Sequence, residues 1–188
     1  MLLRRTVAAA SLPVTLAEAK VQVRETENDE DALIGALLAA AVAAVCARSG
    51  RVLATETWAV SVPGVSGDLV LPKSPVQGVV SIGYFDAADA AAMAVVGDFY
   101  LFTDDDRAYL RPKTGKAWPI TSTRDDALTV TFTAGYAVIP AALRVAVLML
   151  TAHWFTNREA VAVAGQPVEM PDGVAALIGQ ERIGWAAA

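Results

Sequence analysis

The stretch ALTVTFTAGYAVIPAALRVAVLMLTAHWFTNRE, from Ala127 to Glu159, decides the fold because its hydrophobic period changes part-way along. Its first residues alternate apolar with polar side chains, which is the period of a β-strand that buries one face. Pro140 then suits the first position of a helix, where its missing N–H costs nothing. After it, apolar residues recur at helical spacing on one face, formed by Leu143, Val147, Leu150 and Trp154. The chain therefore combines strands with helices.

Several short strands are expected before this stretch. In TWAVSV, the side chains of Trp58, Val60 and Val62 share one face of an alternating pattern. Further strands are expected in LVLPKSPV, VVSIGYFD, DFYLF and AYLRP. No helical pattern long enough to connect parallel strands lies between them, so we expect an antiparallel sheet or a small sandwich. The alanine-rich segment from Asp86 to Ala94 is expected to be a loop or a single helical turn.

Two helices are expected before the strands. The first runs from Thr15 to Arg24, because TLAE forms a capping box between Thr15 and Glu18. The second is expected to be capped by Asn28 or Asp29 and to end near Ser49. Gly50 follows it as the stop. Its buried stripe is expected to consist of Leu33, Ile34, Leu37, Leu38, Ala41, Val42 and Val45.

The sequence thus predicts an α+β chain with an insertion. Residues 14–50 and 136–159 are expected to form an antiparallel helical bundle, because neither flanking helix can bury its apolar stripe alone. Residues 52–135 are expected to form the β insertion between the second and third helices. Residues 160–188 are expected to be a C-terminal arm with one short helix from Asp172 to Gln180.

Composition excludes several classes of protein. The net charge is −5 over 188 residues, with no basic cluster beyond Arg4 and Arg5, so a protein that grips nucleic acid is not indicated. The single Cys46 cannot form an internal disulfide and is expected to be a buried thiol. The uncharged run from Ala32 to Ala47 is shorter than the ~20 residues of a membrane span. We therefore expect a helix of a soluble protein and no membrane partner.

The first twenty residues allow a competing interpretation, a weak signal peptide cleaved after Ala19. Its apolar part is short and is interrupted by Ser11 and Pro13. The capping box at Thr15 favours a helix start in the same place.

No catalytic constellation is visible in the sequence. His153 is the only histidine, and the chain has no G-x-S-x-G, no C-x-x-C and no glycine-rich phosphate loop. We therefore expect no enzyme activity, no metal and no cofactor, with His153 a packed or interface residue. TDDDR, from Thr103 to Arg107, could suggest calcium, but it lacks the alternating ligands and distant glutamate of an EF-hand loop. A hairpin turn is the preferred interpretation.

Two alternatives concern binding. Arg158 and Glu159, beside Trp154, could form an exposed ion pair or contact a neighbouring subunit, and composition leaves both open. A ligand-binding or enzymatic module could instead use a pocket in the β insertion. Its support is a group of aromatic residues that are otherwise expected in the core, Tyr84, Phe85, Tyr100, Tyr109 and Trp118.

Four segments together carry a resemblance to a known family. They are TLAEAKVQVR, DEDALIGALLAAAVAAVCARSGRVLATETW, LVLPKSPVQGVVSIGYFD and VTFTAGYAVIPAALRVAVLMLTAHWFTNREAV. In this order, from about Val14 to Val163, the chain resembles the head–tail connector (adaptor) proteins of long-tailed bacteriophages. The gp6-like and gp8-like connectors, which also occur in prophages and gene transfer agents, are the relatives implied. The apolar AVI after Tyr136 and the arm beyond Val163 depart from the family pattern.

The resemblance implies a structural role in a virion or gene transfer agent particle assembled in the bacterial cytoplasm. Such adaptors form a ring, usually a dodecamer, between the portal protein and a stopper or tail protein. DNA passes through the ring without sequence-specific binding. The candidate residues for a subunit or partner interface are Trp154, Asn157, Arg158, Glu159 and Trp185.

Overall fold

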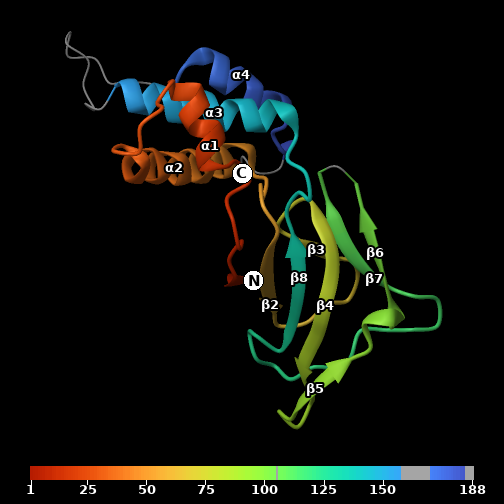
Figure 1. Cartoon of the computed structure of the whole chain (residues 1–188). Helices are drawn as coiled ribbons and strands as arrows, with labels where there is room; N and C mark the ends of the chain where they lie inside the picture. Colours follow the sequence, from red (N-terminus) through yellow and green to blue (C-terminus); the bar gives the residue numbers. More distant parts are fainter. Residues whose placement is uncertain (105, 158–169, 185–188) are drawn as a thin grey trace. The chain divides into compact units, whose positions relative to one another are not determined.

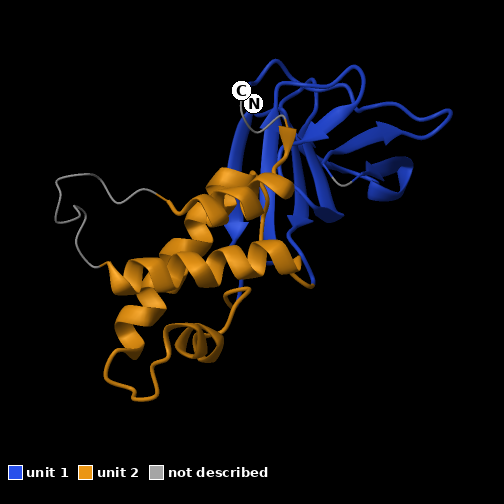
Figure 2. Ribbon diagram, turned by 90° about the horizontal axis from the view of Figure 1, so that it is seen from above, with its two compact units in different colours: residues 1–10, 54–137 blue, residues 11–53, 138–188 orange. Residues whose placement is uncertain are grey.

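The computed structural model describes residues 1–104, 106–157 and 170–184. The chain divides into two compact units (Figure 2). Unit 1 comprises residues 1–10 and 54–137, and contains the strands. Unit 2 comprises residues 11–53 and 138–188, and contains the α-helices. The α+β class expected from the sequence is confirmed.

Unit 2 is built from helices that pack on one another (Figure 1). They are α1 (Leu16–Val23), α2 (Asp31–Ser49), α3 (Ala141–Thr156) and α4 (Asp172–Gln180). The expected capping box of α1 is confirmed. The Thr15 hydroxyl accepts the Glu18 N–H at 3.3 Å, and the Glu18 carboxylate accepts the Thr15 N–H at 2.8 Å. The same carboxylate forms an ion pair with Arg144 of α3, so the cap of one helix also fixes its neighbour.

The start of α2 differs from the expectation that Asn28 or Asp29 caps it. The N-cap is Glu30, which makes no side-chain capping hydrogen bond. The Asn28 amide oxygen instead accepts from Lys20 Nζ at 2.8 Å, and Asp31 pairs with the same ammonium at 2.6 Å. The polar residues of this turn therefore tie α1 to α2 rather than capping α2.

The rest of α2 follows the expected pattern in part, because Leu33, Leu37 and Val42 of the expected buried stripe are only half-buried. Gly50 ends it at φ 75°, with its N–H bonded to the carbonyl of Cys46. Cys46 is half-buried, less so than expected. By length and composition alone α2 could cross a membrane, the one such helix among the described residues. In the structure it buries one side against the other helices through Ile34, Leu38, Ala41 and Val45.

Helices α3 and α4 complete the core of unit 2. Pro140 precedes α3 as its N-cap rather than occupying the first helical position. The side chains that α3 buries include Leu143, Val147 and Leu150, as their spacing indicates. Within the segment 160–188, the described part forms α4, and the expected helix from Asp172 to Gln180 is confirmed.

The chain after α4 is fixed to the end of α2. The Ile183 N–H donates to the Ser49 carbonyl at 3.0 Å, and Arg51 Nε donates to the Glu181 carbonyl at 2.5 Å. The Ile183 side chain is fully buried. This part of the expected arm is therefore packed within unit 2.

Unit 1 contains two antiparallel sheets (Figure 1). The five-stranded sheet has the order β1-β2-β8-β4-β5, and the three-stranded sheet has the order β3-β7-β6. Their bounds are β1 Leu2–Val7, β2 Glu56–Val62, β3 Leu69–Leu71, β4 Val76–Phe85, β5 Ala91–Ala94, β6 Phe99–Thr103, β7 Ala108–Pro112 and β8 Leu128–Ala134. A short 3-10 turn, Val96–Asp98, precedes β6.

Alternation decides which faces of the sheets are buried. On β8, Leu128, Val130 and Phe132 are buried while the threonines between them are only partly covered. Val60 of β2 lies opposite Val130 of β8. Both side chains therefore point to the buried face, as the alternation in TWAVSV predicts for Val60. The three-stranded sheet likewise buries one face, which includes Leu71 of β3. The buried faces of the two sheets form the core of unit 1.

Two strands were not expected from the sequence. The segment that resembles a signal peptide forms β1, paired with β2 at the edge of the five-stranded sheet, and α1 begins at Leu16. Cleavage after Ala19 would remove that strand and cut α1. The segment from Asp86 to Ala94, expected as a loop or helical turn, ends in β5. Its turn is formed by the Asp86 carboxylate, which accepts the N–H groups of Ala88 and Ala90, so that β5 can pair with β4.

Candidate functional site

The end of α3 holds the described part of the interface expected from the sequence. Asn157 is the C-cap, and both its backbone N–H and its side-chain amide donate to the His153 carbonyl at 2.9 Å. Asn157 is exposed, and Trp154 is half-buried. The structure therefore gives Asn157 a capping role at the end of this helix, and leaves part of Trp154 at the surface.

His153 lies beside this cap with a defined ring orientation. The Asn157 amide nitrogen is 3.3 Å from His153 Nδ1. Because the same nitrogen donates to a carbonyl, Nδ1 must accept, and the proton of a neutral imidazole then lies on Nε2. Within residues 1–104, 106–157 and 170–184, Nε2 is buried and has no hydrogen-bond partner. No carboxylate or nucleophile is bonded to the ring in this part of the chain, so the arrangement offers no acid–base machinery.

The other expected interface residues, Arg158, Glu159 and Trp185, lie outside the described residues. Whether Arg158 and Glu159 pair with each other or with a neighbouring subunit stays a prediction.

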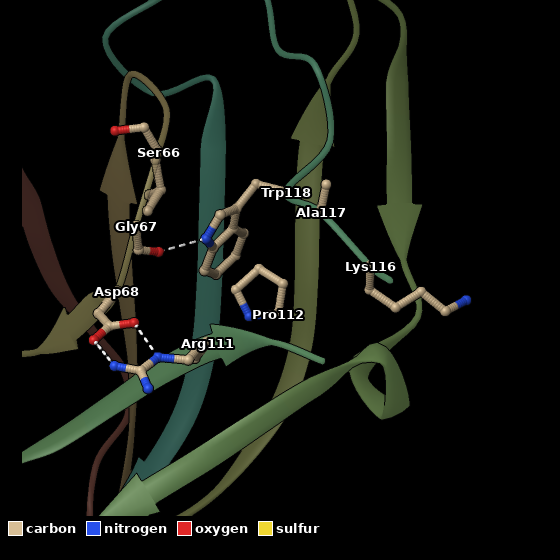
Figure 3. Close-up of a pocket in the computed structure, with 9 residues that line it drawn as sticks. Ser66, Gly67, Asp68, Arg111, Pro112, Lys116, Ala117 and Trp118 are labelled. Atoms are coloured by element: carbon tan, nitrogen blue, oxygen red, sulfur yellow. Dashed lines mark hydrogen bonds and ion pairs between the residues drawn. The ribbon is translucent and has the colours of Figure 1, made fainter. Parts of the chain in front are cut away.

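A surface pocket tests the alternative of a ligand-binding module. It lies in unit 1 and has a volume of about 480 Å³ (Figure 3). Asp68 and Arg111 face each other at one side, joined by hydrogen bonds of 2.7 and 2.6 Å. Trp118 also lines the pocket, and its indole N–H donates to the Gly67 carbonyl at 2.7 Å. The Asp68 carboxylate, the Arg111 guanidinium and the Trp118 indole N–H are thus already bonded to other residues of the lining.

The electrostatics of this pocket do not support catalysis. The hydrogen bond and charge of Arg111 hold the pKa of the Asp68 carboxyl below its usual range. Asp68 raises the pKa of the Arg111 guanidinium in turn, chiefly through the same hydrogen bond. A carboxylate held ionised at the open surface is a poor proton acceptor, because a general base works best with a pKa near the working pH. The pair therefore holds the rim of the pocket together.

The aromatic residues expected in the core of the β insertion are not buried. Of the five considered, only Trp118 lines the pocket. Tyr100 is exposed, and Tyr84, Phe85 and Tyr109 are partly exposed. The buried aromatic side chains of unit 1 are Phe99 and Phe132. The sequence holds no local signal for this exposure, since Tyr100 and Phe102 share one face of β6 in the same alternation that buried strand residues show.

The acidic segment TDDDR is a turn between β6 and β7. The Asp104 carboxylate accepts the N–H of Arg107 at 2.5 Å and that of Asp106 at 2.8 Å. The hydrogen bond from the Arg107 N–H contributes most to lowering the pKa of Asp104, and the one from Asp106 adds to it. The hairpin interpretation is confirmed. Across the described parts of the chain, no group of three or more His, Cys, Asp and Glu side chains could hold a metal ion.

Comparison with known proteins decides the family. The model of the head completion protein family matches residues 14–175. The chain belongs to that family. This head completion protein also matches solved structures over nearly its whole length, whereas a search of curated proteins gives no match.

Its structural relatives come from particle necks. A chain in the neck of an empty gene transfer agent particle, computed with C6 symmetry, is 25% identical, with a TM-score of 0.79, over 97% of this chain and 95% of that one. A chain of the native gene transfer agent virion is also 25% identical, with a TM-score of 0.80 and the same coverage. A neck structure computed with C12 symmetry, at 24% identity and a TM-score of 0.77, shows the shared fold. The resemblance seen in the sequence is confirmed, and the family is structural rather than enzymatic.

Proposed function

We propose that this head completion protein is a head–tail adaptor that forms a ring in the neck of a phage-like particle, between the portal and a stopper or tail protein. The observation that carries the proposal is the likeness, over 97% of the chain, to a chain in the neck of a gene transfer agent particle. The helices of residues 14–50 and 136–159 then act as one antiparallel bundle that carries strands β2 to β8 as an insertion, while β1 joins them from the N-terminal side.

Electrostatics supports a passive conduit for DNA. At least six of the 15 Lys and Arg side chains form ion pairs with carboxylates among the described residues, namely Arg5, Lys20, Arg111, Lys116, Arg124 and Arg144. A cation that neutralises a carboxylate is not available for a phosphate unless that pair is broken. Because each phosphate contact adds to the affinity for DNA, a chain of net charge −5 in which at least six cations already pair with carboxylates is expected to hold DNA weakly. DNA can then slide past without sequence-specific binding.

The ring is proposed as a dodecamer located at the head–tail interface, without contact to a membrane. Trp154 and Asn157 lie at the end of α3, where a neighbouring subunit or the portal could contact them. Arg158, Glu159 and Trp185 are proposed as further members of that interface. If Arg158→Ala and Glu159→Ala left ring formation and particle assembly unchanged, this pairing role would be wrong.

The test of the proposed function is the mass of the purified protein with and without a cognate portal ring, by native mass spectrometry. We expect a single chain of 19.6 kDa in isolation and the recruitment of about twelve copies by each portal ring. A chain that stays monomeric and ignores the portal would contradict the proposal. The match of its fold to neck proteins would stand in that case.

A further inference from the structure

The three-stranded sheet of unit 1 (Figure 1) has one exposed face, and this face is rich in aromatic side chains. The opposite face is buried in the core and includes Leu71 and Leu110. Alternation along β3, β7 and β6 turns a second set of side chains outward. We call this set the aromatic face, and it consists of Val70, Tyr100, Phe102, Tyr109 and Arg111.

The strand register holds these side chains in one array. Tyr109 lies between Val70 on one neighbouring strand and Phe102 on the other, and Arg111 lies opposite Tyr100. The Phe102 and Tyr109 rings are stacked with centroids 5.1 Å apart, and the centroids of Tyr100 and Phe102 are 5.8 Å apart. The Arg111 guanidinium is 5.5 Å from the centroids of both Phe102 and Tyr109. The array is therefore ordered before any partner arrives, which lowers the entropic cost of docking.

Exposure makes this array unusual for a free surface. Val70 is 53% exposed, Tyr100 48% and Phe102 39%. Tyr109 lies between Val70 and Phe102, and the Tyr100 ring adjoins that of Phe102. Large apolar side chains that adjoin at the surface mark interaction sites more often than scattered ones do. Tyrosine, phenylalanine and arginine are the residue types that protein–protein interfaces concentrate. We propose that the aromatic face docks a second copy of this chain.

Charge favours another copy over a nucleic acid. Arg111 is held by Asp68 through two hydrogen bonds, and Lys116 pairs with Asp98 at 3.1 Å, so the cations at this end of the sheet are already balanced. Lys113 Nζ lies 5.2 Å from the Tyr100 ring centroid and adds a positive charge. Copies with a net charge of −5 repel one another at most surfaces, and they can approach where the acidic side chains do not outnumber the basic ones.

The aromatic face is too small for a stable dimer, but its size suits a contact that is repeated around a closed ring. At roughly 200 Å² for a whole aromatic side chain, Tyr100 exposes about 100 Å² and Phe102 about 80 Å². A stable pair buries about 800 Å² on each partner. The aromatic face can thus form the centre of an interface but cannot by itself hold a dimer together. This docking between neighbouring copies rests on the proposed ring. A similar chain occurs in a particle neck that was computed with C6 symmetry.

The direct test is site-specific photocrosslinking in assembled particles. A photoactivatable phenylalanine analogue replaces Phe102, and in a matched control it replaces Val80 of β4, which is 57% exposed on the other sheet of unit 1. We expect irradiation to yield a covalent dimer of this chain from position 102 and at least about fivefold less of it from position 80. The proposal is overturned if the analogue at position 102 crosslinks to DNA, to a different neck protein, or only within its own chain.

Substitution gives a second test. We expect Tyr100→Ser together with Phe102→Ser to raise the concentration needed to load portal rings about tenfold or more, whereas Val80→Ser loads like the wild type. Unchanged melting of the double variant shows that the loss is not unfolding, because both side chains are largely outside the core. Loading equal to the wild type would overturn the inference. A chain that never enters the neck would defeat the proposed function, whereas a chain present in the neck without the dimer crosslink defeats only the aromatic-face contact.

Discussion

Replacing Gly135 by alanine should strongly destabilise unit 1. This glycine follows β8 at φ 126°, a conformation that residues with a Cβ rarely adopt. A Cβ built there would contact the Ala54 carbonyl oxygen, and would lie 2.5 Å from the carbonyl carbon of Ala54 and 2.8 Å from Thr55 N. The backbone cannot move away freely, since the Gly135 N–H donates to the Pro75 carbonyl and the Gln77 amide donates to the Gly135 carbonyl, both at 2.8 Å.

The magnitude follows from those contacts. Strained backbone costs about 1–3 kcal/mol, and forcing extra volume into a packed site costs a further ~1–3 kcal/mol. We therefore expect Gly135→Ala to lower the free energy of unfolding by roughly 3 kcal/mol or more. At about 2–4 °C per kcal/mol for a chain of this size, the melting temperature should fall by roughly 6–12 °C.

Circular dichroism melting and urea unfolding measure this loss. The matched control is Gly67→Ala, because an added Cβ at Gly67 meets nothing within 4 Å. We expect that control to stay within about 1 kcal/mol of the wild type. A Gly135→Ala protein that melts as the control does would refute the clash argument.

Three further predictions concern the cap, the ion pair and the C-terminal packing. Thr15→Ala should cost about 1 kcal/mol in urea unfolding, whereas Thr15→Ser, which keeps the hydroxyl that accepts from Glu18, should cost much less. Because Arg111 lowers the pKa of Asp68, the stabilisation from this carboxylate is present above its unfolded pKa of about 3.9 and is lost as the pH falls through the lower folded value. An NMR titration of Asp68 should show its midpoint rising toward ~3.9 in Arg111→Gln. Because the Ile183 side chain is fully buried, Ile183→Ala should lower the free energy of unfolding of unit 2 by roughly 2–5 kcal/mol and speed proteolysis after α4. Proteolysis at the wild-type rate would contradict this packing.

The sequence was sufficient to predict those features that depend on residues close together in the chain. The capping box at Thr15 and the stop at Gly50 depend on contacts within a few residues, so local spacing was enough to predict them. The inward face of β2 followed from alternation, because Val60 is buried in the core. The prediction that Asn28 or Asp29 caps α2 was wrong, because the side-chain amide oxygen of Asn28 accepts a hydrogen bond from Lys20, eight residues earlier.

The N-terminal strand shows what pattern reasoning cannot detect. All six residues of β1 are exposed, so burial imposes no alternation on them. The strand is held by backbone pairing with β2, which is more than forty residues away in the sequence, and by an ion pair of 2.9 Å between Arg5 and Glu56. Unit 1 is consequently made from two separate pieces of chain, 1–10 and 54–137. A boundary drawn at residues 52–135 would leave that edge strand behind.

The aromatic face was missed for a related reason, and the same reason bears on assembly. A hydrophobic residue on a strand has the same sequence signature whether the core of its own chain or a neighbouring copy covers it, so Tyr100 and Phe132 were indistinguishable before the structure placed one outside and the other inside. A contact too small for a stable pair can still be decisive in a closed ring. Each copy there makes the contact twice, and the last copy closes two contacts at once. In the proposed assembly, the portal raises the local concentration of copies by binding them next to one another, which turns a weak pairwise contact into an intramolecular one. If the proposed function holds, free chains are then expected to stay apart until the portal is present.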